Sequence, residues 1–237
     1  MSPSTEEIPP WGRRVLEREL VQPIITAAKE GMQNRDLALL KVDRMHVAPR
    51  ALELSPAAAQ RRFMAVWAPL EELLSRLRLL PVGLVRFWLQ QPGGHVVITH
   101  LPPSYEPGTR LLKRHALQNV ARVSVSDLAR DSLDALVPVG HLLDHLLGCA
   151  GAEDGKWLSE AGGLNPALSR VGTRVVELFE LGYGFDKAAR DDVRAYWARS
   201  LALYLHDRGA LNAADPLMEK LLRTTVLSSA FWRPIKG

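Results

Sequence analysis

The sequence predicts an α+β protein that is mainly helical, with a small sheet of three to four strands and an N-terminal helical extension. Long stretches of the chain repeat apolar residues at three- and four-residue intervals, which is the spacing of one face of a helix. The middle of the chain instead contains short runs of β-branched and aromatic residues separated by glycine and proline. At 237 residues and 47% hydrophobic content, the chain can bury a core of its own without disulfide staples.

The first part of the chain is expected to form a flexible tail followed by a helical lobe. Residues 1–10 are polar and contain prolines, as mobile termini often do. Apolar residues then recur at helical spacing from Trp11 to Ala28, which predicts an amphipathic helix that covers a core. Residues 11–80 are therefore assigned to an N-terminal helical lobe.

A second helix of this lobe is predicted to begin at Ser55-Pro56. Serine is a favoured helix cap, and proline fits the first helical position because its φ is preset. The apolar pattern continues to Leu77, and Pro69 inside it should kink or divide the helix. Residues 36–53 fit either a helix or a strand.

A small sheet is predicted in the middle of the chain. Residues 84–89 and 95–101 are rich in strand formers, and residues 90–94 between them contain proline and glycine, which is typical of a hairpin turn. Residues 102–108 are expected to form a loop, and residues 119–125 a third strand.

The remainder of the chain is predicted to be helical. One helix should begin at Ser132 or Asp134 and end at Gly148. Three later helices each follow an Asn or Asp that can cap the first turn, at Asn165, Asp186 and Asp215.

His141 and His145 have the spacing of two metal ligands on one helix. Residues four apart lie one above the other, so an H-x-x-x-H pair can hold one zinc ion, although two histidines on an apolar helix more often bind no metal. In the active H-E-x-x-H signature, the glutamate is the general base that deprotonates the zinc-bound water. Leu142 occupies that position and cannot exchange a proton. Asp144 points to a different side and is expected to be a solvated acid or a partner on the helix surface.

The order of elements after residue 80 provides a second, broader pattern. It consists of a small sheet, the H-x-x-x-H helix, a later helix reading Tyr196-Trp-Ala-Arg-Ser-Leu-Ala-Leu-Tyr-Leu205, and a helix that starts with Asp-Pro. This order resembles the peptidase domain of the anthrax lethal-factor-type zinc metallopeptidases, over residues 82–225. The resemblance implies a zincin-like helical core and makes residues 81–237 a degenerate metallopeptidase-like domain.

The resemblance also indicates what has been lost. In that family the later helix supplies a glutamate as the third zinc ligand and another acid one turn on, and these positions fall on Ala195 and Arg199. Together with Leu142, these substitutions remove a base, a ligand and an acid, which predicts loss of catalysis. Family members also use a tyrosine to stabilise the developing oxyanion, and Tyr183 is the nearest upstream candidate.

Asp191 and Asp192 are the candidates for a substitute metal ligand. They lie about one turn before Ala195, although acids in a first helical turn more often serve as caps or interact with the helix dipole. Cys149, the single cysteine, follows His145 by four residues. A structural role is expected for it, because activation of a thiol needs an electropositive, partly exposed setting.

The charge balance does not suggest a nucleic-acid-binding protein. The chain mixes 30 Lys and Arg with 26 Asp and Glu, for a net charge of +4, and has no concentrated basic stripe. No apolar run approaches the length of a membrane span, and the N-terminus lacks the pattern of a secretory signal. We therefore expect a protein of the cytoplasm, or one exported by a nonclassical, specialised route.

The leading hypothesis is a noncatalytic, peptidase-like protein that binds a protein partner, acts as a scaffold or assembles with itself as a structural component. No cofactor is expected in that case. The rival hypothesis is a metal-dependent hydrolase or peptidase of altered site, with a delivered effector as one variant. In it, His141 and His145 would hold zinc together with a nonstandard third ligand such as Asp192.

Overall fold

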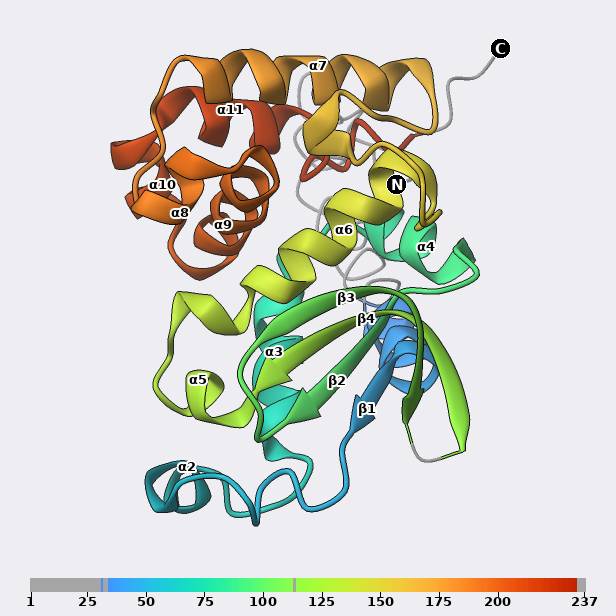
Figure 1. Ribbon diagram of the computed structural model, residues 1–237, viewed down its shortest axis with the longest axis vertical. Helices are drawn as coiled ribbons and strands as arrows, with labels where there is room; N and C mark the ends of the chain where they lie inside the picture. The colour runs from blue at the N-terminus through green and yellow to red at the C-terminus, as the bar shows by residue number, and fades with distance from the viewer. Residues whose placement is uncertain (1–30, 32–33, 113, 234–237) are drawn as a thin grey trace, which may run out of the picture.

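The computed structural model describes residues 31, 34–112 and 114–233. They form a mixed α/β fold in which a four-stranded sheet and its helices occupy one half and a group of helices the other (Figure 1). The predicted tail and the first amphipathic helix, residues 1–10 and 11–28, lie outside the described residues.

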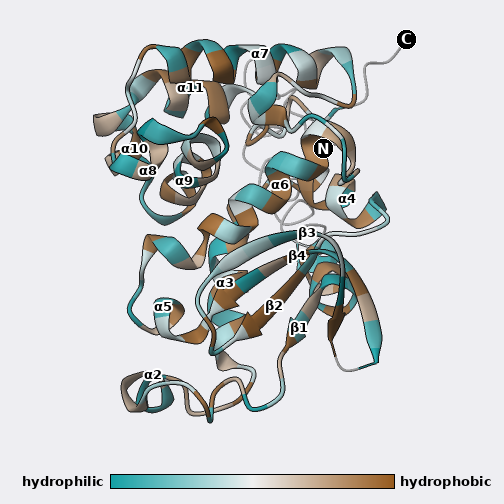
Figure 2. Ribbon diagram, in the orientation of Figure 1, coloured by the Kyte–Doolittle hydropathy of each residue, from teal (hydrophilic) through white to brown (hydrophobic). Residues whose placement is uncertain are grey.

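The sheet has the strand order β1-β2-β4-β3. Its strands are β1 (Met45–Val47), β2 (His95–Thr99), β3 (Ser104–Leu112) and β4 (His115–Ser124). β1, β2 and β4 are parallel, whereas β3 runs antiparallel to β4 and forms one edge of the sheet. β2 lies between two strands and is buried along most of its length, and Figure 2 shows it as a largely hydrophobic ribbon.

The prediction of a strand at residues 84–89 was wrong. This segment belongs to helix α4 (Val82–Gln90), which Pro81 precedes as the cap residue. Its buried residues Leu84, Val85 and Trp88 are spaced as one face of a helix. A short apolar run fits a buried helix as well as a buried strand, and here the packing of the whole domain selected the helix. The predicted hairpin is therefore absent, and β2 pairs with β1 and β4 instead.

The prediction of a loop at residues 102–108 was also wrong over most of its length, because β3 begins at Ser104. Pro107 and Gly108 explain the error. The pairing of β3 with β4 is irregular between Glu106 and Thr109, and such a bulge in an edge strand accommodates a proline and a glycine with φ of 79°. The third predicted strand is confirmed as β4.

In the N-terminal part of the protein, a helical stretch over residues 34–44 leads directly into β1. The helix predicted from Ser55 is divided into α2 (Ala57–Arg62) and α3 (Ala68–Leu77). Pro69 lies in the first turn of α3, as expected of a proline that divides a helix. Ser55 does not cap α2, because its hydroxyl donates a hydrogen bond to the carbonyl four residues earlier. The proposed boundary at residues 80 and 81 stays a prediction.

The C-terminal half is helical, and α6 lies between it and the sheet (Figure 1). In chain order the remaining elements are α5 (Val125–Ala129), the 3-10 turn η1 (Leu133–Ala135), α6 (Val137–Cys149), the 3-10 turn η2 (Leu158–Glu160), α7 (Pro166–Glu180), α8 (Lys187–Asp191), α9 (Val193–His206), α10 (Arg208–Ala214) and α11 (Pro216–Thr224). Asn165 and Asp215 cap α7 and α11, as predicted. Asp186 caps the short α8, whereas Asp192 caps α9. In the described ranges, no helix is long and apolar enough to cross a membrane.

Helix α6 crosses α9 at close range. A Cβ atom at Gly140 would lie 2.5 Å from the carbonyl oxygen of Ala198, so glycine is needed for this approach of the two backbones. α6 ends at Cys149, one residue beyond the predicted stop, and Ala150 closes it with φ of 56°. The crossing fixes α9 beside the histidine-bearing helix.

Candidate functional site on helix α6

Helix α6 carries both histidines, and β3, η2 and α9 pack around it. His145 is fully buried with 0% of its surface exposed, whereas His141 is partly exposed. Tyr105 of β3 makes ring contacts with both imidazoles. The site therefore joins segments that lie far apart in the sequence.

Both ring nitrogens of His145 are engaged within the protein. Nδ1 lies 2.6 Å from the Tyr105 hydroxyl, and Nε2 lies 2.9 Å from the carbonyl oxygen of Ala152. Burial lowers the pKa of His145, so the imidazole is neutral at physiological pH. A carbonyl can only accept, so in the neutral ring Nε2–H donates to it and Nδ1 accepts from the hydroxyl. A metal ion could bind His145 only after one of these hydrogen bonds was broken.

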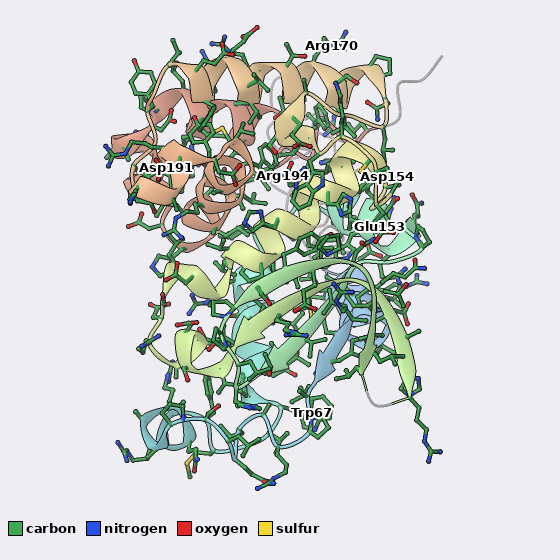
Figure 3. The ribbon with its side chains drawn as sticks, in the orientation of Figure 1. Trp67, Glu153, Asp154, Arg170, Asp191 and Arg194 are labelled. Atoms are coloured by element: carbon green, nitrogen blue, oxygen red, sulfur yellow. The ribbon has the colours of Figure 1, made fainter. Side chains whose placement is uncertain are left out.

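Aromatic packing holds the same ring. His145 stacks on Trp157, with ring centroids 4.7 Å apart and 18° between the ring planes. The guanidinium of Arg194 lies 4.1 Å from the ring centroid of Trp157 and forms an ion pair of 2.7 Å with Glu160. Figure 3 labels Arg194 where α9 approaches α6. The orientation of His145 is therefore fixed by packing as well as by hydrogen bonds.

Asp144 is neither the solvated acid nor the partner on the helix surface that was predicted. It has 0% exposed surface and accepts hydrogen bonds from the backbone N–H of Ser159 at 2.8 Å and from the Ser159 hydroxyl at 2.6 Å. Burial raises the pKa of Asp144 to about 8, against the opposing effect of these two hydrogen bonds. The prediction failed because η2 folds over α6, and helical spacing alone does not reveal which other segment covers a face.

His141 lines a cavity of about 260 Å³ between β3, α6 and α9. Pro103, just before β3, and Asp134, just before α6, complete its wall. The other lining residues include Ser104, Val137, Pro138 and Arg199. Burial lowers the pKa of His141 to about 4, the Asp192 carboxylate opposes this shift, and the charges of Arg194 and Arg199 reinforce it. His141 is therefore neutral at physiological pH and borders a partly apolar cavity.

The three positions that differ from the family's pattern take part in packing and ion pairs. Leu142 is fully buried in the core, and Ala195 is partly buried in the first turn of α9. Arg199 forms ion pairs with Asp134, at 3.1 Å, and with Asp186. These two carboxylates offset the charge of the guanidinium at the edge of the cavity.

The two candidate substitute ligands differ in position. Asp192 caps α9, where its carboxylate accepts hydrogen bonds from the backbone N–H groups of Arg194, at 3.2 Å, and Ala195, at 3.0 Å. Its charge also acts on His141 and partly opposes the lowering of the pKa of that imidazole. Asp191 is exposed at the end of α8, and Figure 3 labels it farther from α6 than Arg194.

A catalytic zinc ion needs three protein ligands and an open position. In the part of the chain that the structure describes, no group of three or more His, Cys, Asp or Glu side chains is arranged to hold a metal. Burial raises the pKa of the Cys149 thiol, which donates to the His145 carbonyl over 3.4 Å, so the environment favours the thiol over the thiolate.

Sequence reasoning missed four residues of this site: Tyr105, Trp157, Ser159 and Arg194. Tyr105 was hidden in a segment read as a loop, and Trp157 and Ser159 follow a glycine-containing loop with no periodic pattern. The tyrosine suggested by the resemblance, Tyr183, is 47% exposed between α7 and α8, whereas Tyr105 contacts the histidines. A local motif could not have revealed these partners.

Comparisons of the chain with protein-family models, with curated proteins and with solved structures found no match.

Proposed function

We propose that this chain is a noncatalytic, peptidase-like protein that binds a segment of a partner protein. The observation that carries the proposal is the state of His145, which is fully buried and uses both ring nitrogens in hydrogen bonds to Tyr105 and Ala152. A metal-assisted hydrolase needs ligands that are free to coordinate, and Leu142 and Ala195 supply neither a base nor a ligand. The zincin-like character of the core is part of this proposal.

The partner segment is expected to bind along β3. This strand pairs with β4 on one side, and no strand within the described ranges pairs with its other side. An extended peptide can add to such an edge through main-chain hydrogen bonds. Most side chains of β3 are exposed or half-buried, so solvent reaches the strand.

The cavity beside His141 would receive one side chain of the bound segment. Val137, Pro138 and the neutral imidazole of His141 form much of its wall. Arg199 at its edge is already paired with two carboxylates. An apolar side chain is therefore expected there, because a charged one would lose hydration without gaining a free counter-ion.

Zinc content tests the noncatalytic part of the proposal. The protein is purified without metal-affinity handling, and zinc per monomer is measured by elemental analysis in the wild type and in His141→Ala/His145→Ala. We expect substoichiometric zinc in both proteins. Because His145→Ala also removes a buried side chain, His141→Ala alone is the control that retains the core. Near-unity zinc that both variants lose would refute the assignment.

Peptide selection tests the binding part. Peptides are selected on the wild-type protein from a random library, and their affinities are compared in two variants. Val137→Trp fills the cavity beside His141, whereas Tyr183→Trp adds a tryptophan at an exposed position between α7 and α8. We expect Val137→Trp to weaken binding at least about tenfold, equivalent to about 1.4 kcal/mol, and Tyr183→Trp to leave it unchanged. Equal binding by both variants would place the peptide elsewhere.

One observation favours the rival function of a metal-dependent hydrolase. The charge of the Asp192 carboxylate partly opposes the lowering of the pKa of His141, so it acts on the imidazole that the rival would use as a ligand. Stoichiometric zinc and a peptidase activity that falls in both His141→Ala and Asp192→Asn would support this rival. Self-association and cellular location stay predictions. Light scattering, which measures the molar mass in solution, can test self-association.

A further inference from the structure

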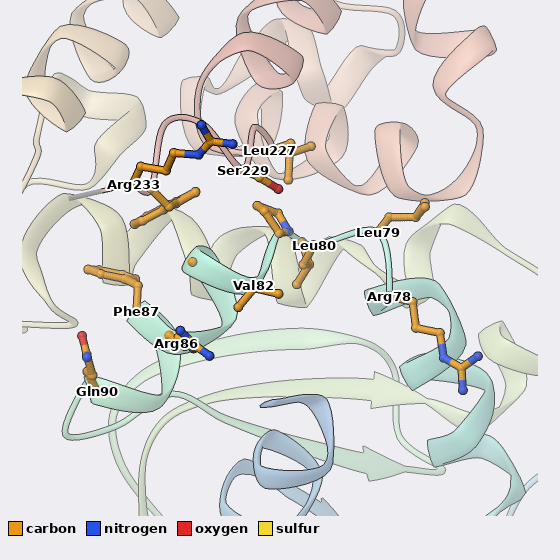
Figure 4. A pocket seen from close by; sticks show the side chains of 13 residues that line it. Arg78, Leu79, Leu80, Val82, Arg86, Phe87, Gln90, Leu227, Ser229 and Arg233 are labelled. Carbon is orange, nitrogen blue, oxygen red and sulfur yellow. The ribbon is translucent and has the colours of Figure 1, made fainter. Parts of the chain in front are cut away.

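Two histidines from different strands of the sheet meet through their ring nitrogens. His46 lies in β1 and His95 opens β2, and the Nε2 atom of His46 is 3.1 Å from the Nδ1 atom of His95. The ring centroids are 5.2 Å apart. Neither histidine lines the groove beside α4 (Figure 4) or the cavity beside His141, so this histidine pair is a separate feature of the molecule.

The register of the sheet brings the two side chains to one face. His46 is the Cα partner of Val97 in the parallel pairing of β1 with β2. His95 precedes Val97 by two residues, and residues two apart on a strand point to the same side. Both imidazoles therefore project from the face that carries Val97, where both are half-buried.

Both rings are neutral at physiological pH. Burial, with smaller effects from the charges of His46 and Arg44, lowers the pKa of His95 to about 4. Burial is also the main cause that lowers the pKa of His46, and the charge of His115 acts in the same direction. A metal ion binds the neutral form of an imidazole, so no proton has to leave an imidazolium before coordination.

The hydrogen bond within the histidine pair joins two potential metal ligands. One neutral ring donates its N–H to the lone pair of the other. The remaining nitrogens, His46 Nδ1 and His95 Nε2, form no hydrogen bond with the described residues, so the donor ring can carry its proton there instead. Both facing nitrogens then present lone pairs. His145 differs, because its partners are a hydroxyl and a carbonyl that an ion at the imidazole would leave unpaired.

The separation of the two facing nitrogens suits a single ion. With metal–nitrogen bonds of about 2.0–2.1 Å, two nitrogens 3.1 Å apart subtend an angle of about 100° at the metal. This value lies between the right angle of octahedral and square-planar coordination and the tetrahedral angle. The same spacing therefore serves a hydrogen bond between the rings or an ion held to one side of the line that joins the nitrogens.

We propose that His46 and His95 bind one divalent transition-metal ion of the kind that prefers imidazole, such as Zn²⁺, and that this ion clips β1 to β2. Within the described ranges no group of three His, Cys, Asp or Glu side chains is arranged to hold a metal, so water fills the other coordination positions. The positive charge of Arg44 opposes a cation beside His95. With only two protein ligands, the site is weak and loses its ion during purification.

A bound ion would act on the edge of the sheet. β1 has three residues and pairs with β2 alone among the described strands. His46 and His95 are 49 residues apart in the sequence, so the ion closes a long loop of the chain. A metal clip of this kind stabilises the folded state by lowering the conformational freedom of the unfolded chain.

Calorimetric titration of the metal-free, full-length protein with Zn²⁺ tests the site. His46→Gln and His95→Gln each remove one ligand but keep a polar side chain, and His206→Gln removes a half-buried histidine of α9 as the control. We expect about one Zn²⁺ per chain in the wild type and an affinity at least about tenfold lower in each ligand variant. The control should bind as the wild type does. No binding by the wild type, or wild-type affinity in either ligand variant, would overturn the proposal.

Nuclear magnetic resonance of the wild-type imidazoles locates the ion without depending on the fold of a variant. Two-bond ¹H–¹⁵N spectra are recorded as Zn²⁺ is added. The signals of His46 Nε2 and His95 Nδ1 should shift together and stop shifting at about one equivalent. Shifts at His141 and His145 instead, or none, would overturn the proposal. The zinc test of the α6 histidines is independent, because His141→Ala/His145→Ala leaves this histidine pair intact.

Discussion

Replacing Asp144 by asparagine is expected to remove a pH-dependent loss of stability from the core. The side chain is fully buried, and its pKa is raised from 3.8 to about 8 because burial disfavours the carboxylate. Asparagine has nearly the same shape and no charge to desolvate. Its amide oxygen can accept from the backbone N–H of Ser159, and its NH₂ group can donate to the Ser159 hydroxyl, which reverses the direction of that bond but leaves both groups with a partner.

The sign of the effect follows from proton binding. Below pH 3.8 the carboxyl group of Asp144 is protonated in both the folded and the unfolded chain, so it contributes no pH dependence. Between pH 3.8 and about 8 the unfolded chain ionises while the folded chain keeps its proton, so the free energy of unfolding falls as pH rises. At 1.36 kcal/mol per pH unit, the free energy of unfolding at pH 7 is about 4 kcal/mol lower than at pH 3.8 because of this group.

Urea unfolding at pH values from 4 to 8, followed by tryptophan fluorescence, measures this effect. The difference in unfolding free energy between Asp144→Asn and the wild type should grow steadily with pH and favour the variant, while other titrating groups cancel in the difference. Asp154→Asn, at an exposed position, controls for the loss of a carboxylate. A difference that stays constant from pH 4 to 8, or a variant less stable than wild type at pH 8, would refute the reasoning.

Further predictions concern the contacts of α6. Tyr105→Phe should destabilise the fold by about 1–3 kcal/mol, because Nδ1 of buried His145 loses its donor; unchanged urea unfolding would contradict this. Gly140→Ala should cost about 1–3 kcal/mol by forcing α6 away from α9. Gly209→Ala, whose new Cβ atom meets only the Asp207 carboxylate at 3.2 Å and no backbone, should cost less in the same assay. The lowered pKa of His141 makes the folded wild-type chain resist protonation, so its free energy of unfolding should fall as pH falls from 6.5 to 4. His141→Gln should lessen that fall. An unfolding free energy that depends on pH equally in both proteins over this range would count against the prediction.

Local signals in the sequence were sufficient for two helices of the C-terminal half, whereas the helix expected after Asp186 is divided into α8 and α9. A cap depends on backbone groups two or three residues away, so Asn165 and Asp215 mark the starts of α7 and α11 without reference to the rest of the fold. The sheet was predicted less well. The run at residues 84–89 is compatible with helix and strand, and β3 contains a proline and a glycine that only an irregular edge strand tolerates.

The sequence by itself determined that His141 and His145 share one turn of helix and that Leu142 stands where a base would be needed. Only the tertiary structure decided what the histidines do. Tyr105 and Ala152 reach His145 from other segments and use both of its nitrogens, and spacing along one helix does not encode such contacts. The reason is physical, since the protonation and coordination of a buried imidazole depend on the groups packed around it, and those groups are brought together only when the chain folds.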